Sequence, residues 1–487
     1  MGDISARGAA AFTEAAAPAA SDDDAGARKY YDVAVIGGGV VGHGIAWAAR
    51  RSGRSVALID DAPGSGASWA AAGMLAPVSE LHYQEEALLE LMLESSRLWP
   101  AFAAGLERGD GGPGTGARAS AAGGTGAGTG YLTTPTLAVG ADAADRRALA
   151  DLRTVQQAYG LAVEPLTVRA ARIREPLLSP GISCAFDIPA DHQVDPRRLL
   201  ARMGELLAAD SDCHTISRRA AGLLWEDGRV VGASLEGSGF IRAGETIVAN
   251  GLGAASLDGL PAGLRLPLRP VHGDILRLRV PARLRPLLTS TVRGLVRGVP
   301  VYIVPRQDGT VVIGATQRED DLGGNSGPAA PAGGTSMTAA PASTAVSAGG
   351  VYQLLRDAQR LVPAVAELEL LEATARARPG TPDNAPLLGR VAEQGRPGDV
   401  TGLIIATGFF RHGILLTPAA AEICRQLLDR VADPRWAHFR PDRFAAGTPA
   451  DDTPAAPASA AGTPAAGPQD TDARHANPNP EHSKETV

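Results

Sequence analysis

The sequence predicts an α/β protein of two domains, one of which is assembled from separate stretches of the chain. Three observations support this class. A short apolar strand at Asp32–Ile36 runs directly into a glycine-rich turn and a helical pattern. A second strand followed by glycines lies near the other end, at 404–413. Between them, residues 267–317 have the pattern of antiparallel strands.

The first predicted elements form a β-strand, helix, β-strand unit. This unit comprises the strand at 32–36, the helix Val40–Arg51 and the strand Ser55–Asp60, and a long helical pattern follows at Glu85–Leu106. The chain then returns to its closing element at 404–413, so the first domain is expected to be discontinuous. Further strands are predicted at 223–225, 230–235, 245–248, 274–279, 301–304, 311–315 and 367–375, with a helix at 351–361.

The domain boundaries follow from this order and from local composition. Residues 1–29 and 446–487 are rich in Ala, Pro, Ser, Thr and charge, and we expect disordered tails there. Two Gly/Ala/Ser/Thr stretches, 109–130 and 322–350, are expected to be flexible insertions. The predicted cofactor domain comprises 30–85, 187–262 and 372–435, and the predicted substrate domain, an α+β unit on an antiparallel sheet, comprises 86–186 and 263–371.

The bulk composition excludes several classes of function. A net charge of -7 gives no basic surface for nucleic acid. No stretch approaches the length of apolar chain that a membrane span needs. Cys184, Cys213 and Cys424 show no metal-ligand spacing, and we expect no metal and a reducing, cytoplasmic location. The two lysines, Lys29 and Lys484, both lie in the predicted tails.

The glycine turn has the spacing and context of a dinucleotide-binding loop. Gly37 permits a tight turn, Gly39 lets a phosphate approach the backbone, and Gly42 allows close packing of helix on strand. Asp60 ends the next strand, where a carboxylate can bind a ribose hydroxyl. The alternative is an ordinary glycine turn followed by a solvated Asp60-Asp61 pair. The motif does not separate NAD from FAD, but the small residues at 64–76 favour a long flat ring lying against the backbone.

Several motifs resemble the D-amino-acid oxidase family of flavoproteins, and most closely the glycine oxidases of thiamine biosynthesis. The likeness covers about residues 30–435 without the two insertions. It predicts a Rossmann-like FAD-binding domain beside the substrate domain. The matching segments are Val35–Gly42, Ala67–Leu75, Gln193–Arg197, Tyr302–Arg306, Ile313–Thr316, Arg378–Asp383 and Gly408–Pro418.

The resemblance implies a non-covalent FAD. Its pyrophosphate would lie against Val40 and Val41, and its ribose would meet Asp60 and Asp61. Ala221 would give a backbone contact on the adenine side. The flavin would be bordered by two groups of residues: the loop residues Ala67, Ser68, Ala72, Gly73 and Met74, and the covering turn of Phe409, Phe410, Arg411, His412, Gly413, Ile414 and Leu415.

The resemblance also assigns a substrate site. Arg378 would bind the substrate carboxylate, because a guanidinium can grip it through two parallel hydrogen bonds. Tyr302 would be its hydrogen-bonding companion, with Arg411 and Gln317 nearby. Without the motif, Arg378 would be an ordinary surface arginine and Tyr302 a core residue. Arg411 can instead orient its loop, and His412 is expected to be structural.

The expected reaction moves a hydride from the substrate Cα to flavin N5, which requires positioning rather than an acid or base. Glycine is the expected substrate, O2 the acceptor, and an imine and hydrogen peroxide the products. A thiazole synthase would be the functional partner, and we expect a homo-oligomer. The alternatives are a D-amino-acid oxidase or quinone-linked dehydrogenase, a sarcosine-type oxidase and, less favoured, a tRNA-modifying flavin domain or a non-catalytic FAD-binding protein.

Two departures and two absences refine this expectation. The family often has Arg-Asn-Gly where this chain has Arg411-His412-Gly413, and Gln317 replaces a side chain that can be apolar. Sarcosine oxidases use a lysine for oxygen activation and a cysteine to tether flavin. No lysine lies in the predicted folded region, and Arg376 occupies the position of the tethering cysteine. These absences favour a primary-amine substrate and a non-covalent flavin.

Overall fold

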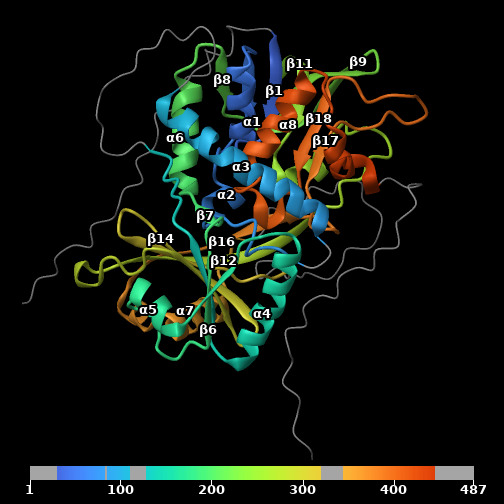
Figure 1. Cartoon of the computed structure of the whole chain (residues 1–487). Helices are drawn as coiled ribbons and strands as arrows, with labels where there is room; N and C mark the ends of the chain where they lie inside the picture. The colour runs from blue at the N-terminus through green and yellow to red at the C-terminus, as the bar shows by residue number, and fades with distance from the viewer. Residues whose placement is uncertain (1–29, 83–84, 110–127, 320–343, 445–487) are drawn as a thin grey trace, which may run out of the picture. The chain divides into compact units, whose positions relative to one another are not determined.

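The computed structural model describes residues 30–82, 85–109, 128–319 and 344–444. They contain two eight-stranded sheets and a short two-stranded pair (Figure 1). The predicted tails and the middle of each predicted insertion lie outside the described residues. No helix among the described residues is long and apolar enough to cross a membrane.

The first sheet is mainly parallel and has the strand order β17-β18-β11-β1-β2-β8. Only β17 runs antiparallel to its neighbour on this path, and the hairpin β9–β10 extends from β11. The predicted first β-strand, helix, β-strand unit is confirmed. The bounds are β1 Tyr31–Ile36, β2 Val56–Ile59, β8 Cys213–Ile216, β9 Ala220–Glu226, β10 Arg229–Leu235, β11 Phe240–Val248, β17 Leu387–Gly389 and β18 Leu403–Thr407.

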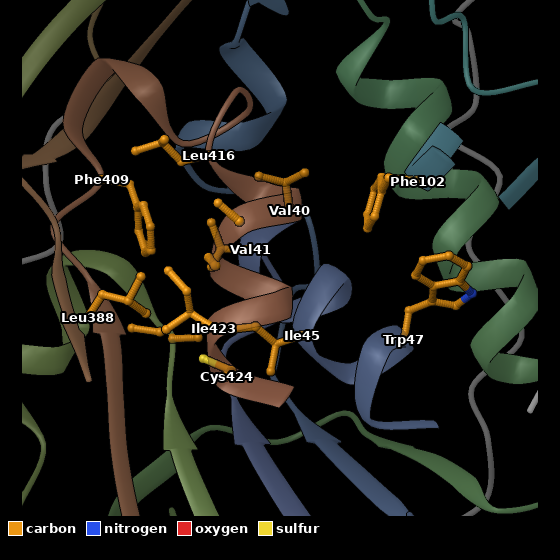
Figure 2. Close-up of a cluster of buried hydrophobic side chains, with 14 of the residues drawn as sticks. Val40, Val41, Ile45, Trp47, Phe102, Leu388, Phe409, Leu416, Ile423 and Cys424 are labelled. Atoms are coloured by element: carbon orange, nitrogen blue, oxygen red, sulfur yellow. The ribbon is translucent and has the colours of Figure 1, made fainter. Parts of the chain in front are cut away.

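Four helices form one core with this sheet: α1 Val40–Arg51, α3 Glu86–Arg108, α6 Pro196–Ala208 and α8 Thr417–Leu428. Their apolar residues, among them Ile45 and Leu91, pack with Val33 of β1. Figure 2 shows side chains of α1 and α8 meeting in this core. The predicted boundary at residue 86 would assign α3 to the other domain. Its apolar face packs here instead, against α1, α6 and α8.

The second sheet is mainly antiparallel, in the order β16-β12-β15-β14-β13-β4-β6-β5, with one parallel pair between β13 and β4. Helices α5 Val168–Arg174 and α7 Ala348–Leu361 share a second apolar core with it. Helix α4, Ala143–Ala158, contacts β4 and β13. The strands are β4 Thr136–Gly140, β5 Glu164–Leu166, β6 Cys184–Ile188, β12 Arg269–Arg279, β13 Thr291–Val296, β14 Val299–Pro305, β15 Thr310–Gly314 and β16 Glu369–Gly380.

Three predicted boundaries differ from the structure around this sheet. Strand β16 pairs with β12 along its length, although a boundary at 372 would place most of it in the first domain. Helix α7 begins at Ala348, inside the predicted insertion 322–350, and Ser347 caps it. At the end of the other insertion, Thr129 is fully buried. Composition alone therefore overestimates both insertions, because Gly and Ala also occur in packed elements.

Candidate active site

The glycine turn after β1 is shaped by close backbone contacts. Gly37 has φ +111°, and a Cβ there would lie 2.6 Å from the carbonyl carbon of Ala249. A Cβ on Gly42 would lie 1.9 Å from the carbonyl oxygen of Gly37. Gly39 is the N-cap residue of α1 and has no side chain to cap the helix. The Val40 N–H instead donates a hydrogen bond of 3.1 Å to Ser68 Oγ. Side chains at Gly37 and Gly42 are thus excluded by neighbouring backbone, and their absence lets the turn pack closely at the start of α1, where a phosphate would bind.

Asp60 lies where the ribose acid was predicted, directly after β2. Its Oδ2 accepts a 2.5 Å hydrogen bond from the Gly38 N–H, and its Oδ1 accepts one of 2.8 Å from the Ala62 N–H. The carboxylate therefore lies against the glycine turn. Asp61 is exposed and pairs with Arg219 at 3.0 Å. The carbonyl of Ala221 accepts from the Asp258 N–H, 3.1 Å away.

The small residues after this turn lie against the second sheet. Ala67 and Ser68 are in the short helix α2, Ala67–Ala70, and Met74 begins β3, Met74–Leu75, which pairs with β7, His192–Gln193. Gly73 has φ +74°, and a Cβ there would lie 2.0 Å from the carbonyl oxygen of Val194. Ala72 and Met74 pack with Ile275 and Tyr302. This segment therefore connects the predicted cofactor site with the predicted substrate strand.

The turn from Phe409 to Leu415 lies between β18 and α8. Phe409, Ile414 and Leu415 belong to the first core, whereas Phe410 has φ +47°, uncommon for a residue other than glycine. The buried ring of Phe410 has the guanidinium groups of Arg269 and Arg411 at 5.7 and 5.4 Å from its centroid. Strained backbone of this kind occurs often at ligand sites. The turn contacts β16, the strand that carries Arg378.

Arg378 and Tyr302 lie on the same face of the second sheet. The strand register aligns Tyr302 with Gly314 and Gly314 with Ile275, and Arg378 is in phase with them on β16. Each side chain lies over a glycine. A Cβ on Gly273 would be 2.2 Å from Arg378 Nη1, and one on Gly314 would be 2.3 Å from the Tyr302 hydroxyl. The two predicted substrate residues are therefore together.

The charge of Arg378 has no acidic partner among the described residues. Its Nη1 donates a 3.4 Å hydrogen bond to the Thr316 carbonyl, and no carboxylate of the described chain lies within ion-pair distance. Burial raises the pKa of Tyr302 to about 12, so its hydroxyl keeps its proton at neutral pH. A cation and a hydroxyl donor on one face can bind a carboxylate.

The neighbouring arginines are already paired. Arg411 pairs with Glu85 at 2.6 Å, and Asn384 donates to the same carboxylate at 3.3 Å. Arg293, which lies opposite Tyr302 on β13, pairs with Glu80 at 2.7 Å. The pair with Glu85 is thus a contact through which Arg411 can orient the turn 409–415. Gln317 is exposed, one residue beyond the Thr316 carbonyl that contacts Arg378.

His412 is buried beside Glu80. Its ring is 1% exposed and its Nδ1 lies 3.4 Å from Glu80 Oε2. Burial holds the pKa of His412 well below its usual value, and the charge of Arg411 lowers it further. Partial desolvation, with the charges of Arg411 and Arg293, also lowers the pKa of His82 to about 4, although His82 has an exposed surface. Both imidazoles are therefore neutral at neutral pH.

Sequence reasoning missed Glu80, His82, Glu85 and Arg293. The two glutamates follow the Ala67–Leu75 motif closely, and this proximity was the available signal. The loop that carries Glu80 is held by a buried carboxylate: Asp191 accepts hydrogen bonds of 2.9 Å from the N–H groups of Val78 and Ser79. Burial raises the pKa of Asp191 to about 6.

The residues present fit a dinucleotide cofactor and a small carboxylate. The first sheet offers a tight glycine turn, a helix whose N-cap residue is Gly39, and Asp60 beside the turn. At the end of β11, the buried Asn250 Oδ1 has no hydrogen-bond partner among the described residues. No group of three metal-ligating side chains suited to a metal ion occurs in the described parts of the chain.

Comparisons with known proteins agree with this geometry. A family model described as FAD dependent oxidoreductase matches residues 32–427. Glycine oxidase from Geobacillus kaustophilus is 31% identical over 411 residues, which are 82% of this chain and 93% of that protein. A crystal structure of glycine oxidase from Geobacillus kaustophilus superposes with a TM-score of 0.69 at 29% identity and covers 85% of this chain and 98% of that one.

A second relative is longer than this chain. The bifunctional protein ThiO/ThiG of Trichormus variabilis is 29% identical over 418 residues, or 85% of this chain. The match spans 55% of that protein's length. The chain therefore corresponds to about half of the bifunctional protein.

Proposed function

We propose, since the chain belongs to the FAD dependent oxidoreductase family, that it oxidises a small amino acid, with glycine foremost, at the α-carbon. The observation that carries this proposal is the pair Arg378 and Tyr302. A guanidinium that has no acidic partner in the described ranges shares a sheet face with a protonated hydroxyl, and this face packs against Ala72 and Met74. Similarity to glycine oxidase supports the choice of glycine.

The two side chains have separate tasks in this proposal. Arg378 binds the substrate carboxylate through its planar fork and keeps its charge throughout. The Tyr302 hydroxyl donates a hydrogen bond to the same carboxylate. Gly273 and Gly314 let both side chains lie flat on the sheet. The substrate is thereby oriented with its α-carbon away from the sheet, toward the segment of Ala72 and Met74, and orientation of this kind lowers the barrier.

FAD would be held at the first sheet and would supply the hydride acceptor when bound. Its contacts would come from the glycine turn, from Val40 and Val41, and from Asp60 beside the turn. The segments 67–74 and 409–415 would border its ring. Asp61 and Ala221 remain in the proposed set, although the first is exposed beside Arg219. Arg376 occupies the position of the tethering cysteine and donates to the Ser65 carbonyl at 2.9 Å. An arginine at this position cannot form a covalent bond to the flavin, so we propose a non-covalent FAD.

We also propose the electron acceptor and the fate of the product. O2 would accept the electrons and give hydrogen peroxide, and the imine product would pass to a thiazole synthase in a reducing cytoplasm. Similarity to the bifunctional ThiO/ThiG protein supports the link with thiazole synthesis. A homo-oligomer remains our expectation.

The test is anaerobic reduction of the purified yellow protein by glycine, sarcosine and D-alanine, followed at the flavin absorbance. We expect glycine to reduce the flavin fastest. Much faster reduction by sarcosine or D-alanine would support the corresponding alternative and contradict the choice of glycine. No reduction by any of the three would contradict the amino-acid oxidase proposal.

A further inference from the structure

Three guanidinium groups share the neighbourhood of Tyr302, and two of them are neutralised. Arg293 lies opposite Tyr302 across the β13–β14 pair, and Arg411 lies in the turn that contacts β16, the strand that carries Arg378. Glu85 neutralises Arg411 at 2.6 Å, and Glu80 neutralises Arg293 at 2.7 Å. Arg378 alone keeps an uncompensated charge in this group of described residues.

The other charged residues nearby have contacts of their own. His82 and His412 are neutral at neutral pH. The guanidinium of Arg306, on the same sheet face, donates to neutral acceptors: the carbonyls of Ala72 and Val194 and Gln193 Oε1. Arg277 lies 3.7 Å from Glu372, which also pairs with Arg197 at 2.7 Å. Both arginines add positive charge, but among these described groups Arg378 is the guanidinium that has neither a carboxylate nor several acceptors, and it matches one substrate carboxylate.

We propose that Glu80 and Glu85 determine substrate specificity by making the site accept one carboxylate and reject two. The inference rests on the proposed function and narrows it to monocarboxylic amino acids. A second substrate carboxylate would approach Arg411 or Arg293 and meet the glutamate already bound there. The second substrate carboxylate and the glutamate carry the same charge and repel each other. This repulsion would discriminate against substrates with two carboxylates.

Glu85 is the more informative of the two residues to change. The side chain of Glu85 is 9% exposed and that of Arg411 is 18% exposed, so the pair is largely shielded from solvent. Glu85→Gln keeps the size of the side chain, removes its charge and releases Arg411. The released guanidinium can then bind a second carboxylate. The expected result is a gain of function, which a destabilised protein would not give.

The experiment compares D-aspartate with D-asparagine, which have the same size and differ by one charge. Each is measured as a substrate by anaerobic flavin reduction and as a competitive inhibitor of glycine oxidation. In Glu85→Gln we expect the preference for D-aspartate over D-asparagine to rise about 10-fold to 100-fold, as expected for one charge-assisted hydrogen bond. Glu80→Gln should change the ratio in the same direction.

Two further variants control the result. Glu85→Gln combined with Arg411→Gln should lose the gained preference, because the freed guanidinium is gone. Glu245→Gln removes the carboxylate from a similarly shielded pair with Arg390, 3.0 Å apart in the first sheet, and should leave the ratio unchanged. An unchanged ratio in Glu85→Gln, or exclusion of both compounds from every variant, overturns this inference. Failure of the wild-type protein to oxidise glycine would instead overturn the proposed function.

Discussion

The two sheets present their functional groups in opposite ways. At the first sheet, the proposed ligand-facing groups are backbone amides of the glycine turn and of the start of α1, and the turn itself depends on missing side chains. At the second sheet, the proposed functional groups are the side chains of Arg378, Tyr302 and Arg293, held on one face by strand register. A backbone site is thus contained in a few consecutive residues. A side-chain site depends on several distant segments.

This difference predicts which substitutions damage each region. The backbone site should be sensitive to an added methyl group, and the side-chain site to a removed charge. Each kind of change should leave the other region intact, because the two regions have separate apolar cores.

Gly42→Ala should have the largest effect. The new Cβ would lie 1.9 Å from the Gly37 carbonyl oxygen, inside the glycine turn. We expect loss of the yellow flavin from the purified protein and a decrease of about 3 kcal/mol or more in the free energy of unfolding. Flavin content and denaturant unfolding measure this. Gly66→Ala is the matched control, since its Cβ would have no neighbour within 4 Å. Full flavin content in Gly42→Ala would break the comparison.

Arg378→Ala should disable the second sheet and leave the first intact. We expect kcat/KM for glycine to fall roughly 100-fold or more, corresponding to about 3 kcal/mol from lost charge-assisted hydrogen bonds. Flavin content should equal that of the wild type. Arg279→Ala is the control and should leave kcat/KM unchanged, because Arg279 is an exposed residue of β12 that pairs with Glu369 of β16. A normal kcat/KM in Arg378→Ala would remove Arg378 from the site.

Asp191 should make stability depend on pH, because it holds the segment between the two regions. Burial raises its pKa from 3.8 to about 6, so the folded protein binds its proton more tightly than the unfolded chain. The contribution of Asp191 to stability should therefore be present below pH 4 and fall by on the order of 2 to 3 kcal/mol as pH rises to about 6. Denaturant unfolding of wild type and Asp191→Asn measures it. Parallel pH profiles would contradict the prediction.

Gly204→Ala should have the smallest effect, and it should be stabilising. Gly204 lies inside α6, and its Cβ would meet only His43 Nε2, at an ordinary 3.8 Å. Alanine should raise the free energy of unfolding by about 0.5 to 1 kcal/mol through helix propensity. A loss of stability would mean that glycines of the first domain are needed beyond the turn.

The sequence alone predicted the local structure of the glycine turn better than the arrangement of Arg378 and Tyr302. The glycine turn, the helix after it and Asp60 lie within 24 consecutive residues, 37–60, and their spacing reflects the geometry directly. Arg378 and Tyr302 were identified through motifs of a resembling family. The structure then placed them on one face through the register of β16, β12, β15 and β14. No local pattern contains that register.

The charge pairs could not be predicted for the same reason. Glu85 and Arg411 are separated by 326 residues, and Glu80 and Arg293 by 213. In a chain rich in arginine, sequence does not indicate which guanidinium groups are neutralised. The packing of α3 with the first core and the pairing of β16 with β12 likewise depend on tertiary contacts, which local composition does not encode.

Gly273 and Gly314 give the substrate side an unusual kind of adjustability. Because Arg378 and Tyr302 lie over these two glycines, the height of both side chains above the sheet depends on residues outside the proposed binding pair. A single methyl group at either position would lift one binding group and leave its chemistry unaltered. Evolution, or an engineer, can therefore tune how large a molecule fits without replacing the groups that hold it.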